Sequence, residues 1–319
     1  MIKLEYNATK DRYLLRFKFN HNYIGLARQI SGGFFDRDLE AWSFPSDVQS
    51  VKLILSVFYQ LEIQVNLREI PKRVGIFDDL FDAIRIRNYS LQTAKTYYSN
   101  IFCLCSHYQK LPNRITFEDI VNYIKIQQIE YNKSVTTIRS MQQSFLFYFK
   151  MVKSQIPDLR FPRMKKSIYL PEVLSESEVL SLCHSLTNFK HKLLLKLAYS
   201  SGLRVSEVVK LKYSHIDFDR KMIKIQQGKG KKDRYSLLAE SLLSELQFHK
   251  EEQRKNYKYK QNPSLPHSKI SNDWIFPGSS NSHLSIRTAE KIFENARDKA
   301  QIQKKVSFHS LRHAFATHL

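Results

Sequence analysis

The chain contains 319 residues, of which 42% are hydrophobic and 13% aromatic, so it is long enough for two or three domains with hydrophobic cores and is not a disordered protein. Its 51 lysine and arginine residues against 30 aspartate and glutamate residues give a formal net charge of +21, which favours a polyanionic partner such as nucleic acid. Ribosomal and membrane-surface proteins can be equally basic, but no apolar run approaches the length of a membrane span, and we expect no signal peptide.

The chain has three cysteines, Cys103, Cys105 and Cys183, which fall within apolar helical patterns. Because they are few and odd in number, a disulfide framework or a zinc site is not expected, and all three are predicted to be buried small apolar side chains. Such cysteine usage is typical of a reducing cytoplasm.

Residues 1–70 predict a small α+β unit. Apolar and polar residues alternate over 13–19, as in a half-buried strand that ends at a turn signal over 20–22, and a second β segment is expected over 41–45. Asp47 is then expected to cap a helix whose apolar residues recur at helical spacing. With 9 basic and 8 acidic side chains, this unit is expected to serve in packing or protein contact rather than to bind DNA independently.

The span from residue 76 to about residue 153 is predicted to be wholly helical, with four or so amphipathic helices and with Ser90, Thr116 and Ser134 among the N-caps. Helix N-termini are natural phosphate sites, so the polar and basic side chains just inside two of these helices are candidate nucleic-acid contacts. They are Thr93, Lys95, Thr137, Arg139 and Gln143. The alternative is ordinary capping with solvated polar faces.

A strongly basic stretch over 160–166, punctuated by a proline, predicts a linker to a further domain. Ser175 and Glu178 have the spacing of a capping box at the start of that domain. The domain is expected to mix helices with a β-hairpin or small sheet. Its predicted elements are helices near 176–186 and 189–201, a hairpin over 222–238, a loop over about 255–272, a helix over 285–300 and a terminal helix.

Two basic residues of this domain stand at turns, from which a side chain can enter a cleft. Arg204 lies where one helix ends at Gly202 and the next begins, and its planar guanidinium matches two phosphate oxygens. Lys229 lies between two glycines in the hairpin turn, where its ammonium can meet a phosphate or donate a proton to a departing oxygen. Taken singly, a surface ion pair and a solvated basic turn are simpler explanations. The order of the glycines and lysines does not fit a Walker loop.

The terminal helix places His309 and Arg312 three residues apart on one face. His309 and His313 also stand four apart, as in a metal-binding helix, but no carboxylate lies between them as a metalloprotease helix requires. We therefore expect no metal site and no cofactor.

Three segments together resemble the catalytic boxes of the tyrosine recombinases, the phage-integrase and Xer-like family. These segments are 201–207, 228–234 and 309–313. The stretch from Tyr89 to Tyr97 is similar to the start of that family's helical core-binding (SAM-like) domain. The resemblance implies a mainly α fold with small β elements. Its expected domains are an α+β unit over 1–70, a helical DNA-clamp domain over 76–165 and a mixed α/β catalytic domain over 170–319.

The resemblance also implies roles for individual residues. Arg204 and Arg312 would clamp the scissile phosphate of duplex DNA and stabilise the phosphorane-like transition state without a metal ion. Lys229 would be the general acid for the leaving 5′-hydroxyl, His309 a proton-transfer and phosphate-positioning group, and Glu207 a support for the basic groups. Further DNA contacts are expected at Arg163, Lys165, Lys166, Lys231, Lys232 and Arg234.

The sequence departs from the family pattern at the nucleophile. The family's nucleophilic tyrosine lies well C-terminal to the histidine–arginine box, whereas all 17 tyrosines of this chain precede His309. We therefore expect a chain truncated before that tyrosine, which binds DNA but is inactive alone. The complete protein is expected to recombine DNA as a dimer or tetramer, in the bacterial cytoplasm at the nucleoid. The alternatives are a non-catalytic protein that occupies recombination sites and, more distantly, a topoisomerase-like enzyme.

Overall fold

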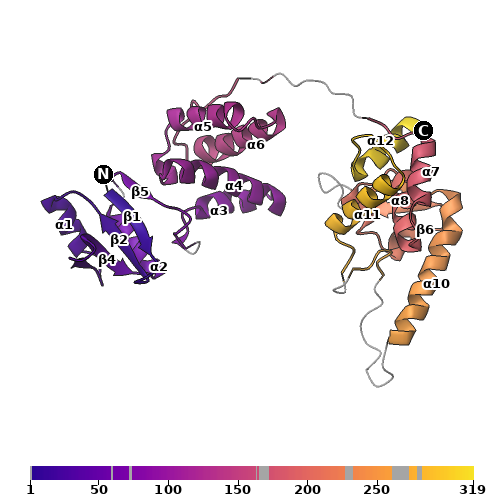
Figure 1. The fold of residues 1–319 in the computed structure, drawn as a ribbon, viewed down its shortest axis with the longest axis horizontal. Coiled ribbons are helices and arrows are strands. Elements are labelled where there is room, and N and C mark those ends of the chain that lie inside the picture. The colour runs from indigo at the N-terminus through magenta and orange to yellow at the C-terminus, as the bar shows by residue number, and fades with distance from the viewer. Residues whose placement is uncertain are drawn as a thin grey trace. The chain divides into compact units, whose positions relative to one another are not determined.

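The computed structural model describes residues 2–58, 60–71, 74–162, 164, 172–226, 233–260, 273–278 and 282–319, with only the backbone described over 256–260. The chain divides into two compact units, residues 1–167 and 168–319 (Figure 1). Both contain helices and a small sheet, so the prediction of a mainly α fold with small β elements is confirmed. The further division of the first unit near residue 70 stays a prediction.

The first unit opens with a five-stranded sheet in the order β3-β4-β2-β1-β5. Every neighbouring pair is antiparallel except β1 and β5, which are parallel. The strands are β1 (Ile2–Asn7), β2 (Arg12–Arg16), β3 (Phe34–Asp36), β4 (Ala41–Pro45) and β5 (Ile63–Val65). Two helices, α1 (His21–Arg28) and α2 (Val48–Val57), accompany the sheet.

The alternation of apolar residues places one face of this sheet in the core. Leu4 pairs with Leu15, which pairs in turn with Trp42, and all three belong to the buried cluster together with Val51 and Ile54 of α2. Asp47 caps α2 through a hydrogen bond from the Ser50 backbone N–H, as predicted. Register is fixed because a slip by one residue would turn these side chains to the opposite face.

The predicted strand over 13–19 was too long at its C-terminal end. β2 ends at Arg16, and the side chain of Phe19 is 78% exposed. The predicted turn over 20–22 is the start of α1, because the Asn20 side chain accepts hydrogen bonds from the backbone N–H groups of Asn22 and Tyr23. Asparagine favours turns and helix N-caps through the same hydrogen-bonding geometry, so the residue type does not separate the two structures.

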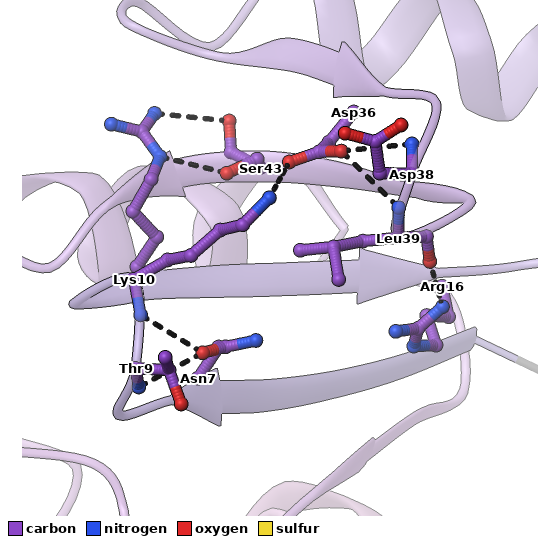
Figure 2. Close-up of polar contacts among 9 residues, drawn as sticks. Asn7, Thr9, Lys10, Arg16, Asp36, Asp38, Leu39 and Ser43 are labelled. Atoms are coloured by element: carbon purple, nitrogen blue, oxygen red, sulfur yellow. Dashed lines mark hydrogen bonds and ion pairs between the residues drawn. The ribbon is translucent and has the colours of Figure 1, made fainter.

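Polar side chains on and around the sheet bind one another (Figure 2). Lys10 pairs with Asp36 at 3.0 Å, the Arg12 guanidinium donates to Ser43 Oγ at 2.7 Å, and Arg16 donates to the carbonyl oxygen of Leu39. The cationic groups of Lys10, Arg12 and Arg16 are therefore bound within this region. Residues 1–70 also have nearly equal numbers of basic and acidic side chains, so few of their positive charges are left for a polyanion.

Further helices of the first unit follow this sheet along the chain. They are α3 (Asp78–Ile86), α4 (Leu91–Tyr108), α5 (Phe117–Ile129) and α6 (Val135–Phe145), which continues into a π-helical segment, η3 (Leu146–Val152). The predicted caps are confirmed, since Ser90, Thr116 and Ser134 each accept a hydrogen bond from the backbone N–H three residues later. Cys105 is buried as predicted, whereas Cys103 is exposed, because its side chain lies on the outer face of α4.

One hydrophobic cluster joins the sheet to these helices. It runs without interruption from Leu15 and Phe44 through Ile70 and Phe77 to Tyr148. In addition, the backbone N–H of Val65 in β5 donates to the carbonyl oxygen of Gln109 at the end of α4 at 2.9 Å.

The second unit surrounds its own core with helices and a three-stranded antiparallel sheet. Its elements are α7 (Glu176–His184), α8 (Phe189–Ser200), α9 (Val205–Val208), β6 (Ile216–Asp217), β7 (Met222–Ile225), β8 (Arg234–Leu237), α10 (Leu243–Lys260), α11 (Ile286–Lys299) and α12 (Phe308–His318). The capping box of Ser175 and Glu178 is confirmed, as is the hairpin of β7 and β8. The predicted loop over 255–272 was wrong at its start, because α10 continues to Lys260. Residues 261–272 lie outside the described part.

Among the described helices, none combines the length and apolar character needed to cross a bilayer.

Candidate active site

The site is built around the junction of α8 and α9. Gly202 follows α8 with φ of +57°, in the left-handed region, and a Cβ at this position would collide with the Phe315 ring of α12. Glycine therefore allows both the turn and the close approach of α12. Arg204 comes two residues later as the N-cap of α9, so its side chain starts from a fixed backbone position.

Glu207 is the anionic centre of the site, with a side chain only 7% exposed. Its carboxylate accepts hydrogen bonds from the Arg204 backbone N–H at 2.9 Å and from the Arg204 guanidinium at 2.8 Å. It also accepts two from the Arg234 guanidinium of β8, at 2.8 and 2.7 Å. Burial alone would raise the pKa of Glu207, but the hydrogen bonds from Arg234 and Arg204 outweigh it and lower the pKa to about 2. The carboxylate is therefore charged at neutral pH.

α12 brings Arg312 to the same junction. The buried Leu311 and Ala314 anchor this helix in the core, and the Arg312 guanidinium donates a hydrogen bond to the carbonyl oxygen of Gly202. Burial, followed by the positive charges of Arg204 and Arg234, lowers the pKa of Arg312. These charges act on Arg312 because the three guanidinium groups lie near one another, and Glu207 binds those of Arg204 and Arg234.

His309 lies one helical turn before Arg312 on α12, and its side chain reaches the surface. Burial lowers its pKa, and so do the positive charges of Arg312 and Arg204 and the neighbouring His313. The His309 and His313 rings meet edge to face with centroids 4.7 Å apart. A histidine with a lowered pKa is neutral at pH 7, when one ring nitrogen can accept a proton and the other can donate a hydrogen bond to a phosphate oxygen.

The geometry of this site suits a phosphate diester. Two guanidinium groups share one carboxylate and a third, that of Arg312, lies nearby, which leaves positive charge and N–H donors for an incoming anion. Among the described residues, no set of three histidine, cysteine or acidic side chains is placed to hold a metal ion.

The structure thus brings together Arg204, Glu207, His309 and Arg312 from separate parts of the sequence. It adds Arg234 to this group. The sequence predicted Arg234 only as a DNA contact, and its bidentate pairing with Glu207 was not expected. The general-acid candidate Lys229 lies outside the described residues, as do Lys231, Lys232, Arg163, Lys165 and Lys166.

The candidate DNA contacts of the first unit lie on α4 and α6. Thr93 and Thr137 each have their backbone N–H bound to a capping serine, so these two N–H groups are not available to a phosphate. Lys95 and Gln143 are exposed, and the Arg139 guanidinium donates to the carbonyl oxygen of Met164. The side chains remain candidates for surface contacts.

A cleft of about 680 Å³ opens beside Arg204 and Glu207. Its lining includes basic and aromatic side chains that the sequence analysis did not single out, namely Lys210, Lys212, His215, Lys224 and Trp274. Lys210 and Lys212 lie close to Arg204 in the sequence and could have been noticed there. Trp274 could not, because it is distant in sequence and only the fold brings it to the cleft. A second cleft, of about 320 Å³, lies between α11 and α12 with His309 on its wall.

The second unit is thus a mainly helical domain with a cationic site, in which one buried carboxylate binds Arg204 and Arg234 and Arg312 lies at the same helix junction. Residues 172–319 match the phage integrase family, and residues 76–157 match the N-terminal SAM-like domain of phage integrases. The chain belongs to the phage integrase family, that of the tyrosine recombinases.

Individual proteins agree with this assignment. A putative integrase/recombinase of Sinorhizobium fredii is 32% identical over 271 residues, covering 84% of this chain and 80% of the relative. Tyrosine recombinase XerA of Pyrococcus horikoshii is 32% identical over 192 residues, or 59% of this chain and 62% of that protein. The structure of a lambda integrase dimer bound to a core site has the same fold, with a TM-score of 0.57 at 17% identity over 76% of this chain and 88% of that one.

Proposed function

We propose that this chain is a site-specific DNA recombinase or integrase, which binds duplex DNA and breaks and rejoins it by metal-free transesterification. The observation that carries the proposal is the convergence of Arg204, Arg312 and His309 around Glu207 in a member of this family. The net charge of +21 supports a nucleic-acid partner.

In the proposed reaction, Arg204 and Arg312 bind the non-bridging oxygens of the scissile phosphate. A tyrosine hydroxyl oxygen forms a bond to phosphorus as the bond from phosphorus to the 5′-oxygen breaks, which leaves a 3′-phosphotyrosine. The neutral His309 ring takes the tyrosine proton, and Lys229 donates a proton to the leaving 5′-oxygen. Glu207 holds Arg204 and Arg234 in place, so that the guanidinium groups are organised before the phosphate arrives. Rejoining reverses these steps with the 5′-hydroxyl of a partner strand.

We assign DNA binding to both units. The helical domain over 76–165 would form one arm of a clamp around the duplex, with Lys95, Arg139 and Gln143 as contacts, and the catalytic domain over 170–319 the other. The lambda integrase neighbour was solved as a dimer on DNA, which supports self-association of this chain on its target.

The proposal is tested by selecting bound duplexes from a random-sequence pool and measuring affinity for the selected duplex against a scrambled one. We expect sequence-specific binding that weakens steeply with salt. The Arg204→Lys variant should lose much of this affinity although it keeps the charge, because lysine lacks the planar guanidinium. Equal affinity for the selected and scrambled duplexes would count against a site-specific recombinase. DNA relaxation without exchange between two copies of the selected site would favour the topoisomerase-like alternative.

A further inference from the structure

The cleft beside the arginine cluster has features of a second anion site. Its wall carries four basic side chains, Arg204, Lys210, Lys212 and Lys224, and the carboxylate of Glu207. That carboxylate is already bound by Arg204 and Arg234. Within the described part of the chain, no carboxylate pairs with Lys210, Lys212 or Lys224, so their charges remain available to a ligand.

The backbone that carries Lys212 is held firmly. The segment 211–213 runs antiparallel to 273–275, with the Tyr213 N–H donating to the Asp273 carbonyl oxygen at 2.9 Å and the Ile275 N–H donating to that of Leu211 at 3.0 Å. The ammonium of Lys212 lies 4.6 Å from the centroid of the Trp274 ring. A cation held over an aromatic face keeps its N–H donors for an oxygen ligand, and it is partly ordered before the ligand binds.

His215 adds a neutral donor to the same wall. The backbone N–H of Lys212 donates to His215 Nδ1 at 3.4 Å, so the neutral ring carries its proton on Nε2. The pKa of His215 is lowered first by burial and then by the positive charges of Lys212 and Lys224. The negative charge of the nearby Asp273 raises this pKa, but less than burial and the lysines lower it. The Asp273 carboxylate accepts hydrogen bonds from Ser214.

Lys224 completes the cleft from β7. It pairs in register with Tyr235 of β8, which places it on the face of the hairpin opposite to that of Ile223 and Ile225, the two core residues of the strand. The cleft is therefore lined from the segment after α9, from β7 and from the strand-like segment around Trp274. Side chains held by strands and paired backbone segments are positioned more precisely than side chains on loops, which suits ligand binding.

We propose that Lys210, Lys212, His215 and Lys224 bind a backbone phosphodiester of the DNA substrate next to the scissile phosphate, with Trp274 positioning Lys212. This inference rests on the proposed function, because Arg204 belongs to both sites and links them. The second contact would fix the register of the duplex, so that the scissile phosphate meets Arg204 and Arg312.

The test is the salt dependence of duplex binding by the full chain. Each neutralised phosphate contributes about 0.9 to the slope of log affinity against log salt, so Lys212→Gln with Lys224→Gln, which removes the contact with one phosphate, should lower the slope by about 0.9 and the affinity roughly tenfold. Because Lys212 packs on Trp274, a second pair, Lys210→Gln with Lys224→Gln, tests the same site without disturbing that contact. Lys212→Arg with Lys224→Arg should restore most of the slope.

The matched control is Lys255→Gln with Lys291→Gln. These lysines are exposed and pair with Glu252 and Glu294, and the double variant changes the net charge by the same amount. An equal loss of slope in the control would overturn the site, because the effect would then come from net charge alone. An unchanged slope in both cleft variants would also overturn it, while steep salt dependence of the wild type would leave the proposed function intact.

Failure of the wild-type chain to bind any duplex would instead refute the proposed function, and the second site with it. A separate titration with inorganic phosphate distinguishes a DNA site from a site for a free anion. Tight binding of the ion that is lost in the cleft variants, with no change in the DNA slope, would overturn the assignment to DNA.

Discussion

The Arg234 guanidinium of β8 donates two hydrogen bonds to the Glu207 carboxylate of α9, one to each oxygen, at 2.8 and 2.7 Å. This bidentate contact ties the hairpin to the helix junction that carries Arg204. Glu207 therefore holds the guanidinium groups of Arg204 and Arg234 in place, although its carboxylate itself repels a phosphate.

Replacing Glu207 by Gln should therefore destabilise the second unit. The change leaves two guanidinium groups without their anion, and hydrogen bonds between charged groups of this kind contribute about 2 kcal/mol each when one partner is buried. We expect a loss of at least about 2 kcal/mol in urea unfolding. Glu240→Gln serves as the control, because Glu240 pairs with Lys221 on the exposed surface and should change stability by less than about 0.5 kcal/mol. Equal effects of the two substitutions would contradict the buried role of Glu207.

The same carboxylate predicts a pH dependence. Its pKa is about 2 in the folded protein against an ordinary value of 4.5, so its stabilisation is fully present above about pH 4.5 and is lost as the pH falls towards 2. The contribution is about 3 kcal/mol, since one pKa unit corresponds to about 1.4 kcal/mol. The difference in unfolding free energy between wild type and Glu207→Gln should shrink over this range and stay constant from pH 5 to pH 7. A difference that is independent of pH would show that Glu207 is not held as an anion.

Substitution of Gly202 by Ala tests the approach of α12. The alanine would have to keep φ near +57° and place its Cβ against the Phe315 ring, so we expect a loss of about 2 kcal/mol or more in thermal or urea unfolding. Gly25→Ala is the matched control in the first unit. Gly25 lies within α1 with nothing near its Cβ position, and alanine there should be neutral or stabilise by about 0.5 to 1 kcal/mol.

A nicked suicide duplex containing the selected site tests for covalent chemistry by the chain's own tyrosines. We expect no protein–DNA adduct on a denaturing gel through the tyrosines that the structure holds in place. Tyr199 binds His318 Nδ1 through its hydroxyl, and Tyr213 is buried. An adduct that disappears in Tyr235→Phe, at the exposed tyrosine of β8, would show that the nucleophile differs from the family pattern.

Much of this architecture follows from local sequence signals. Ser90, Thr116, Ser134 and Ser175 cap their helices as predicted, because capping depends on a few adjacent residues. The convergence of Arg204 and Arg312 was expected from the family resemblance alone, since no local rule relates residues so far apart. The pairing of Arg234 with Glu207 escaped prediction for the same reason.

Two other predictions were wrong for different reasons. Asn20 is a helix N-cap where a turn was expected, because asparagine favours both structures. α10 continues through a polar stretch where a loop was expected. Helical side chains that face solvent need no apolar periodicity, so hydrophobic spacing gives no signal there. Cys103 was assigned to the core by its apolar neighbours, although it stands on the other face of α4 from Cys105.

The hydrophobic cluster that joins the first sheet to α3 and η3, together with the hydrogen bond from Val65 to Gln109, has a consequence for how the first unit melts. Elements that share one core lose their packing together, so the sheet and the helices should unfold in a single cooperative transition. A chain cut after residue 70 would expose apolar surface on both pieces. We therefore expect the N-terminal sheet to unfold together with the helices that follow it rather than in a separate transition.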